Sequence, residues 1–520
     1  MPECCRLFVA SLLVVLSALG QDRADCVEAV REFKRFFKQF KELPQQREAV
    51  LTLLGQDCPE AVEELLKLSR HKQPAIRQAA VSVMSSYRNP ATFQPWLEQL
   101  GDLRPEQQVT MIRVLSNAGI RQASVALLEL LNDPKASPQT KFEVARALAK
   151  IGDESAAEAI APLLGDADAL VRMAAVDCVG KLPLRSLAKD VVPLLGDEEW
   201  QVQSAAVTAV GVVRPQEAVQ PLIDLMRKSG RLQIECSEAL FRVTGMDFGL
   251  DPDRWQQQWD VLMGIEGWRI PTEEELAKRA ASRAKYDELY GATSKRNTFA
   301  GIPTTSTRVL FLVDISGSMD DLVVEREKFA DHDGYEKLLI VRDHLTETID
   351  TLTADTYFDI VAFASDVKAW KKKLVPANII NRASAKAWVE RLKPLGGTED
   401  QELASAGLGG LVDLSAGKTN TLKALLYPFG IDGDKPPPKQ TFTKAGKVSI
   451  KNKLDTVYFL SDGRPSVGRL VDTREILEEV RNHNEVFRIV FHAIAIGEFQ
   501  KAFLRDLATQ NGGVFVDLGR

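Results

Sequence analysis

The 520-residue sequence is poor in the residues that carry thiol and imidazole chemistry. It has 6 cysteines and 5 histidines, and no CxxC pair or Cys/His spacing typical of a zinc site. HExxH and GxSxG are absent, and the histidines form no visible cluster, which argues against the common hydrolase classes. A strong charge of one sign is also lacking. The net charge of -6 is spread over many residues and gives no general attraction to nucleic acid.

Long apolar runs are scarce as well, and only the N-terminus carries a marked one. Arg6 is followed by a mainly apolar stretch at 7–16, which at about ten residues is too short to span a bilayer. Ala18 and Gly20 occupy the -3 and -1 positions of a cleavage site, so residues 1–20 are typical of a secretory signal peptide. We therefore expect export to the periplasm or the extracellular space, with no membrane span after cleavage.

What the sequence does contain, first, is an internal repeat. The segment PLLGD at 162–166 recurs at 193–197, and the Ala-rich segment VRMAAV at 171–176 is matched by VQSAAV at 202–207. Each unit reads as two helices that cannot bury their apolar faces alone, so stacked units form an all-α solenoid. The segment resembles HEAT repeats in a short form, and we place this solenoid at 21–265.

The cysteines that remain after signal cleavage fall in these repeats. Cys26 and Cys58 lie about one repeat apart, near predicted helix starts, and export permits a disulfide between them. Cys178 and Cys236 occupy small-residue positions of repeated helices and fit the role of core thiols.

The pattern changes after the repeats. Residues 266–305 are charged helix and then loop, which we interpret as a linker. From 306 to 520 strands and helices alternate, which predicts a mainly parallel, doubly wound α/β sheet of Rossmann-like type. The expected strands are 309–314, 357–364, 457–461, 487–496 and 514–516, and the expected helices are 334–352, 383–392, 421–429, 472–484 and 500–510.

Hard oxygen donors collect at the predicted carboxyl ends of these strands. The segment DISGSM places Asp314, Ser316 and Ser318 directly after an apolar strand, and Asp462 ends another. In open α/β sheets, ligands bind at this edge. Hydroxyl and carboxylate oxygens suit a small hard cation such as Mg²⁺. A third loop, GKTNT, adds Thr419 at a helix start.

These motifs resemble the von Willebrand factor A domain and its metal-ion-dependent adhesion site. The resemblance implies that Ser316 and Ser318 bind Mg²⁺ directly, with Ca²⁺ or Mn²⁺ as alternatives. It implies that Thr419 binds directly or through water, and that Asp314 and Asp462 hold metal-bound waters. It leaves one metal position for an acidic side chain of a partner.

The threonine ligand has two candidates. Thr398 follows a Gly-Gly pair, as such domains usually have, but twenty further residues precede Thr419. We favour Thr419, because the helix-start pattern follows it. The stretch 399–418 is then an insertion beside the site, and 432–454, with three prolines, is a second one.

Together these features predict an exported, non-enzymatic adhesion or assembly protein. Its A domain would grip an exposed Asp or Glu of a protein partner through Mg²⁺, with the solenoid as scaffold and no role for nucleic acid. The alternatives are a structural scaffold with a vestigial metal site and, with less support, a metal-assisted hydrolase. The sequence names neither the partner nor the oligomeric state.

Overall fold

The computed structural model describes residues 23–228, 230–290, 298–299, 302–303, 305–324, 326–329, 332, 334–408, 413–435, 453–462, 464–497 and 501–518. These residues divide between Ala218 and Val219 into two compact units, and each unit is described by itself. The expected signal peptide lies outside the described residues, as does most of the 432–454 insertion. The domain bounds drawn from the sequence stay a prediction.

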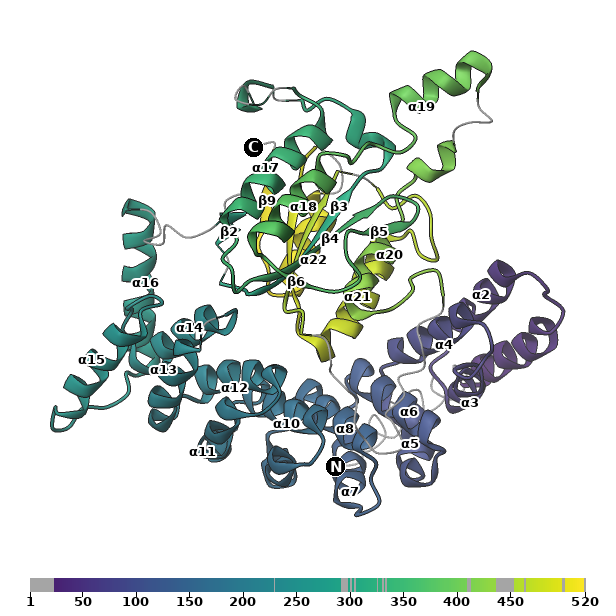
Figure 1. Cartoon of the computed structure of the whole chain (residues 1–520). Coiled ribbons are helices and arrows are strands. Elements are labelled where there is room, and N and C mark those ends of the chain that lie inside the picture. Colours follow the sequence, from purple (N-terminus) through teal and green to yellow (C-terminus); the bar gives the residue numbers. More distant parts are fainter. Residues whose placement is uncertain are drawn as a thin grey trace, which may run out of the picture. The chain divides into compact units, whose positions relative to one another are not determined.

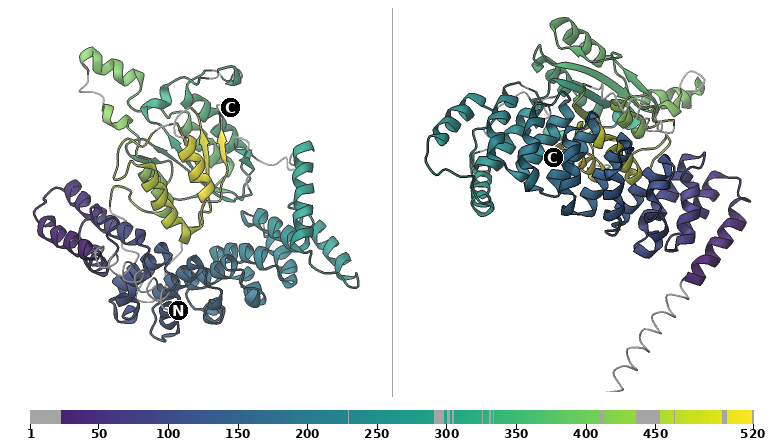
Figure 2. Two further views of the ribbon diagram at one scale, coloured as in Figure 1. Left: turned by 180° about the vertical axis from the view of Figure 1, so that it is seen from behind. Right: turned by 90° about the horizontal axis from the view of Figure 1, so that it is seen from below.

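The first unit consists of stacked helices. Residues 23–37 are helical, and Figure 2 shows the helices that follow lying side by side in a row. They are α2 (Leu43–Leu51), α3 (Pro59–Leu68), α4 (Pro74–Ser86), α5 (Pro90–Leu97), α6 (Pro105–Ala118), α7 (Ala123–Asn132), α8 (Pro138–Ile151), α9 (Ala157–Ile160), α10 (Ala169–Lys181), α11 (Ala188–Val191) and α12 (Trp200–Val213). This arrangement confirms the predicted helical repeat.

Local sequence explains both the helix starts and the close stacking. Several of these helices begin with proline, whose fixed φ and missing N–H suit the first helical position. Small residues face one another between α10 and α12, where a Cβ on Gly180 would lie 3.2 Å from the Cα of Ala209. The alanine-rich pattern therefore sets how near neighbouring helices can approach.

An ion pair between consecutive repeats recurs with the sequence period. Lys141 Nζ lies 2.8 Å from Asp166 Oδ2, and Arg172 makes two 2.8 Å contacts with Asp197. Both members of the second pair follow those of the first by 31 positions. The Arg172–Asp197 pair has the better-defined geometry of the two, because the planar guanidinium matches both oxygens of the carboxylate.

The four described cysteines divide into two kinds. Cys26 and Cys58 form a disulfide, with Cα atoms 6.4 Å apart. Cys178 and Cys236 are free and buried in helices. Burial raises the pKa of the Cys178 thiol to about 12, so it stays protonated and unreactive.

The second unit begins with four helices, α13 (Val219–Arg227), α14 (Leu232–Thr244), α15 (Pro252–Met263) and α16 (Glu273–Tyr290). A short antiparallel pair follows, β1 (Thr298–Phe299) and β2 (Ile302–Pro303). Across the described part of the chain, every helix is too short or too polar to cross a membrane.

The centre of this unit is a sheet in the order β5-β4-β3-β7-β8-β9 (Figure 1). The parallel strands are β3 (Arg308–Asp314), β4 (Tyr357–Phe363), β7 (Thr456–Ser461), β8 (Val490–Ala495) and β9 (Phe515–Asp517). Two short strands, β5 (Val367–Ala369) and β6 (Val375–Pro376), pair antiparallel with β4. This order confirms the predicted doubly wound α/β fold.

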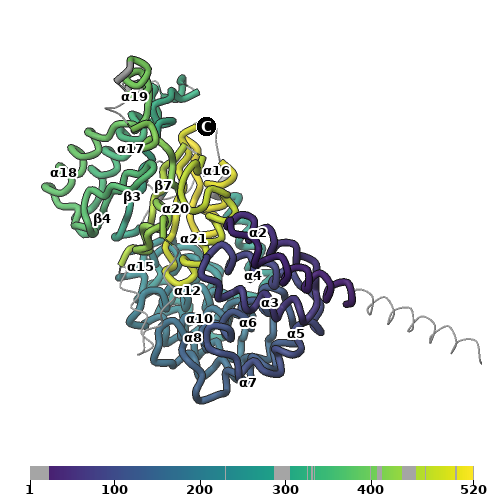
Figure 3. The backbone as a smooth tube through the Cα atoms, turned by 90° about the vertical axis from the view of Figure 1, so that its right-hand side faces the viewer, coloured from purple at the N-terminus to yellow at the C-terminus, as the bar shows by residue number. Residues whose placement is uncertain are grey.

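Helices cover both faces of the sheet, as Figure 3 shows for α17 and α18 on one side and α20 and α21 on the other. Within β3, Phe311 and Val313 pack under α17 (Lys337–Thr351) and α18 (Ile379–Val389). Leu310 and Leu312 face the opposite core, with α20 (Thr421–Leu426), α21 (Thr473–Phe487) and α22 (Lys501–Gln510). Burial on both faces explains the unbroken apolar run of this strand.

The structure corrects some element bounds. The strand expected at 487–496 begins only at Val490, because α21 continues through Phe487 and ends on Arg488 in the left-handed region. Helix α18 begins at Ile379, four residues before the expected 383, where Asn378 caps it. The two antiparallel edge strands β5 and β6 were not predicted.

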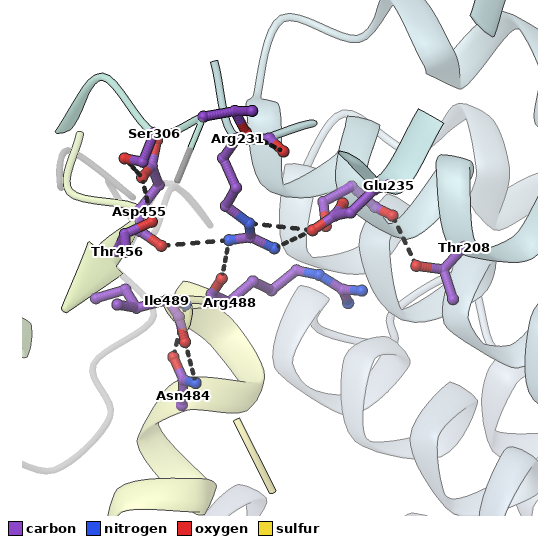
Figure 4. A network of polar contacts seen from close by, with 11 residues as sticks. Thr208, Arg231, Glu235, Ser306, Asp455, Thr456, Asn484, Arg488 and Ile489 are labelled. Carbon is purple, nitrogen blue, oxygen red and sulfur yellow. Dashed lines mark hydrogen bonds and ion pairs between the residues drawn. The ribbon is translucent and has the colours of Figure 1, made fainter. Parts of the chain in front are cut away.

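An arginine from the helical segment lies against the amino ends of two strands (Figure 4). Arg231, just before α14, donates to the carbonyl of Arg488 and to that of Asp455, 3.5 Å away. Its guanidinium also pairs with Glu235 at 2.6 Å. The Asp455 carboxyl is held by Ser306 and by Thr456 Oγ1. Helix α14 is thereby tied to the chain just before β7 and β8.

Replacing Arg231 with methionine will lower the free energy of unfolding of the second unit by about 2 kcal/mol, because charged, part-buried hydrogen bonds to two carbonyls are lost. Denaturant unfolding followed by fluorescence measures this loss. Arg283→Met is the control. The Arg283 side chain is 34% exposed and pairs with Glu238 and Asp247, so we expect a loss of less than about 1 kcal/mol. Equal losses in both variants would contradict the tie.

Candidate metal centre

The candidate site lies where β3 and β7 end, at the same edge of the sheet. The strands are parallel neighbours, with Val313 opposite Leu460. Asp314 therefore ends β3 close to Asp462, which follows β7 directly. Both carboxylates are buried. The sheet topology thus brings together two acidic residues that are 148 positions apart in the sequence.

The turn that carries the two serines is fixed by backbone hydrogen bonds. Ile315 donates to the carbonyl of Phe363 at the end of β4, at 2.8 Å, and its own carbonyl accepts from Leu395 N, also at 2.8 Å. Ser316 is buried and Ser318 partly buried. The hydroxyls are presented by a loop held on both sides rather than by a free turn.

Asp314 is held in place by neighbouring donors. Its Oδ1 accepts from Ser316 N at 2.8 Å, and its Oδ2 accepts from Ser461 Oγ at 2.6 Å. Burial and the nearby Asp462 carboxylate raise its pKa to about 6, against the lowering effect of those hydrogen bonds. The raised pKa means that the ionised form of Asp314 is disfavoured in the metal-free site, first by burial and then by the second carboxylate.

The two serine hydroxyls have a spacing close to that of neighbouring ligands of an octahedral ion, and Asp462 lies beside them. Ser316 Oγ lies 3.3 Å from Ser318 Oγ, which lies 2.9 Å from Asp462 Oδ1. Adjacent ligands of Mg²⁺, with bonds of about 2.0–2.1 Å at right angles, are roughly 2.9 Å apart. No three His, Cys, Asp or Glu side chains gather as a metal-binding group within the described ranges. These residues fit a hard divalent cation.

Thr419 lies at this same edge, between the loops that follow β4 and β7. Its N–H donates to Ser466 Oγ at 2.8 Å, and the next residue, Asn420, donates its N–H to the carbonyl of Ala364 at 2.8 Å. Thr419 is 4% exposed, and Asn420 caps α20 through its side chain. The predicted helix start is present. Hydrogen bonds from the N–H groups of Thr419 and Asn420 hold the backbone of the threonine in place.

Thr398, the alternative ligand, is exposed. It begins α19 (Thr398–Leu403), which projects from the sheet edge in Figure 1. Its N–H donates to Asp320 Oδ2 at 2.7 Å. The Gly-Gly-Thr loop thus contacts the serine loop and starts the 399–418 insertion. Residues 409–412 of that insertion lie outside the described ranges.

Three glycines allow these loops to meet. A Cβ on Gly317 would lie 2.9 Å from the carbonyl oxygen of Gly396, and one on Gly417 would lie 2.2 Å from that of Leu395. Gly396 also has a φ of 65°, in the left-handed region that favours glycine. Side chains at these positions would separate the loops that carry Ser316 and Thr419.

One charged residue of the site was missed by the sequence analysis. Lys337 is the first residue of α17. Its ammonium donates hydrogen bonds to Asp462 Oδ2 at 2.6 Å and to the carbonyl of Ser318 at 3.2 Å. Its side chain is 7% exposed. The one local signal is a lysine at a helix start, where a cation opposes the helix dipole.

Known proteins are similar to parts of this chain. The family model for HEAT repeats matches residues 93–176 and 157–240. Inter-alpha-trypsin inhibitor heavy chain H4 of Bos taurus is 23% identical over 218 residues, 41% of this chain and 18% of that protein. A von Willebrand factor A domain-containing protein of Dictyostelium discoideum is 25% identical over 292 residues, 55% of this chain and 11% of that protein.

The chain is thus similar to HEAT-repeat proteins and to a von Willebrand factor A domain-containing protein. The segment 306–520 is called the A domain below. The chain spans 18% or less of the length of these curated relatives. Proximal thread matrix protein 1 from the mussel byssus, solved with a zinc-occupied MIDAS motif, is 17% identical. It matches with a TM-score of 0.25 over 40% of this chain and 43% of that one.

Proposed function

We propose that this protein is an exported, non-enzymatic adhesion or assembly protein. Its A domain grips an acidic side chain of a protein partner through Mg²⁺, and its HEAT repeats serve as scaffold. The observation that carries the proposal is the meeting of Ser316, Ser318 and Asp462 oxygens at 2.9 and 3.3 Å. Ca²⁺ and Mn²⁺ prefer similar oxygen donors and are the alternative ions.

Each residue has a distinct task. Ser316, Ser318 and Thr419 would bind the ion through neutral hydroxyls, and Asp314 and Asp462 would orient its waters. Neutral ligands leave the charge of the ion largely unquenched. A bound Mg²⁺ supplies an electrophilic position that a partner carboxylate can fill. Hydrogen bonds from the Ser316 N–H and from Ser461 hold Asp314 in the orientation that this task needs.

Export is supported by the signal-like N-terminal sequence and by the disulfide between Cys26 and Cys58. Disulfides form and persist in oxidising compartments and are rare in a reducing cytosol. We place the protein in the periplasm or the extracellular space.

Calorimetric titration of the full chain with Mg²⁺ will show one site, and Asp462→Asn will weaken it by at least about tenfold, because a group that orients metal-bound water is lost. Asp413→Asn is the matched control. Asp413 is an exposed aspartate in the 399–418 insertion whose Oδ1 accepts from Ser415 N, a bond that asparagine keeps. Absence of binding in the wild type, or equal binding in both variants, would overturn the metal site.

The second half of the test concerns the acidic ligand. Immobilised peptides with one exposed Asp will retain the protein in Mg²⁺ and release it in EDTA, whereas the matched Asn peptides will not retain it. Retention that survives EDTA would contradict a grip through the ion.

A further inference from the structure

Lys337 is placed where a lysine is unfavourable on two counts. It is the first residue of α17, where the helix dipole repels a cation. Its side chain is also 7% exposed, and a buried ammonium needs a strong partner. A local arrangement that costs stability is most often found at functional sites.

The surroundings of the ammonium belong to the candidate metal centre. Lys337 Nζ is 2.6 Å from Asp462 Oδ2, while the other oxygen of that carboxylate accepts from Ser318 Oγ at 2.9 Å. Asp321, which is exposed, lies 3.5 Å from the ammonium. Gly497 packs over the pair, since a Cβ there would lie 3.5 Å from Asp462 Cβ and 3.7 Å from Lys337 Nζ. One carboxylate therefore faces the serine hydroxyls and a fixed cation at once.

The charges of this cluster decide what the loaded site attracts. Asp314 and Asp462 are both buried, so a divalent ion alone would neutralise the two carboxylates. Lys337 adds one positive charge at hydrogen-bond distance from Asp462. The Asp321 side chain is 68% exposed, so solvent screens its charge. Counted over the buried groups alone, the loaded site keeps a net positive charge, and buried charges interact strongly.

We propose that Lys337 is a built-in counter-cation that weakens the binding of the metal ion alone and makes the loaded site select an anionic ligand. This inference rests on the proposed function and adds the residue that sets its ligand charge. Metal and acidic partner then bind cooperatively, because the partner carboxylate supplies the charge that completes neutrality. A neutral side chain of a partner supplies no such charge and therefore does not bind cooperatively with the metal.

The test removes the charge of Lys337 but keeps a hydrogen-bond donor. Calorimetry of the full chain will show that Lys337→Gln binds Mg²⁺ about tenfold more tightly than the wild type, since a nearby positive charge is gone. Lys386→Gln is the matched control, because Lys386 pairs with Asp350 at 2.8 Å on the exposed side of α18. It will bind as the wild type does. A purely structural role for Lys337 would weaken binding on substitution and not tighten it.

A second arm uses acetate as the carboxylate probe. Replacing chloride with acetate will tighten Mg²⁺ binding to the wild type and will have less effect on Lys337→Gln. Lys337→Met, which has no donor, repeats the measurement. If either Lys337 variant is unfolded without metal, we expect it to refold when Mg²⁺ is added. Failure to refold would count against the inference.

The outcomes separate the two proposals. If the wild type binds Mg²⁺ but Lys337→Gln binds no more tightly, the role of Lys337 is wrong and the proposed function stands. If only Lys337→Gln binds, the role of Lys337 is supported and the metal grip of the wild type fails. If neither binds, both fail.

Discussion

Replacing Thr419 with valine will weaken Mg²⁺ binding about 100-fold, whereas Thr398→Val will change it by less than about twofold. Valine keeps the shape of threonine and removes only the hydroxyl. Thr419 is 4% exposed and is held through its own N–H and that of Asn420. A fixed hydroxyl at this edge can serve a metal ion without loss of side-chain freedom.

Thr398 is exposed and begins a projecting helix. The backbone N–H of Thr398 makes its structural contact, a hydrogen bond to Asp320. Valine retains this bond. Calorimetric titration with Mg²⁺ measures both variants, and Thr419→Ser, which restores a hydroxyl, should recover most of the affinity. Loss of binding in Thr398→Val together with retention in Thr419→Val would assign the metal to the Gly-Gly-Thr loop instead.

Local pattern was sufficient to predict the fold wherever an element is buried on both faces or repeated. The run at 309–314 became β3. The recurring PLLGD segments lie in short 3-10 helices that end at Gly165 and Gly196, and each precedes one of the stacked helices α10 and α12. Short edge strands such as β5 and β6 have no comparable signal, because three or two residues form no periodicity. The end of α21 was missed because the apolar Phe487 continues directly into the strand sequence.

The site shows the same division. Asp314, Ser316 and Ser318 are neighbours in sequence, and the parallel strand pair β3–β7 adds Asp462 at the same edge. Lys337 could not be found this way. Its contact with Asp462 joins residues 125 positions apart, and in sequence it is an ordinary basic residue of an amphipathic helix.

Contacts made by backbone groups are equally hidden from the sequence. Arg231 donates to backbone carbonyls. Every residue has a carbonyl, so no side-chain pattern in the sequence predicts these partners. Gly417 matters because a Cβ there would meet the Leu395 carbonyl oxygen at 2.2 Å. Such close approaches exist only once three separate loops have been assembled.

The metal-free protein will lose about 3 kcal/mol of stability through Asp314 alone as the pH rises from about 3 to 7. Burial and Asp462 raise the pKa of this carboxyl from 3.8 to about 6 in the folded state. The folded state therefore binds more protons than the unfolded state between these values, so stability falls as the pH rises. Below about pH 3 both states are protonated and this cost is absent. Above about pH 7 both states are ionised and the cost is complete.

Denaturant unfolding in EDTA at several pH values measures this effect, and Asp314→Asn isolates it. Asparagine is neutral at every pH and keeps the oxygen that accepts from Ser316 N, so the fall in stability assigned to Asp314 will disappear. Asp359→Asn is the control. Burial raises the pKa of Asp359 in β4 to about 7, so Asp359 makes its own contribution to the pH dependence. That contribution will persist in Asp314→Asn and disappear in Asp359→Asn. Parallel pH profiles for the wild type and Asp314→Asn would show that Asp314 is ionised at little cost.

Addition of Mg²⁺ then connects this cost to function. A cation bound beside the ionised carboxylate removes the unfavourable charge, so the stabilisation by Mg²⁺ will be larger at pH 7.5 than at pH 5. At the lower pH, protons compete with the ion for the same oxygen cluster. The carboxylate that destabilises the metal-free fold is thus the group that makes the site attract a cation, and partner binding will weaken with acidity for the same reason.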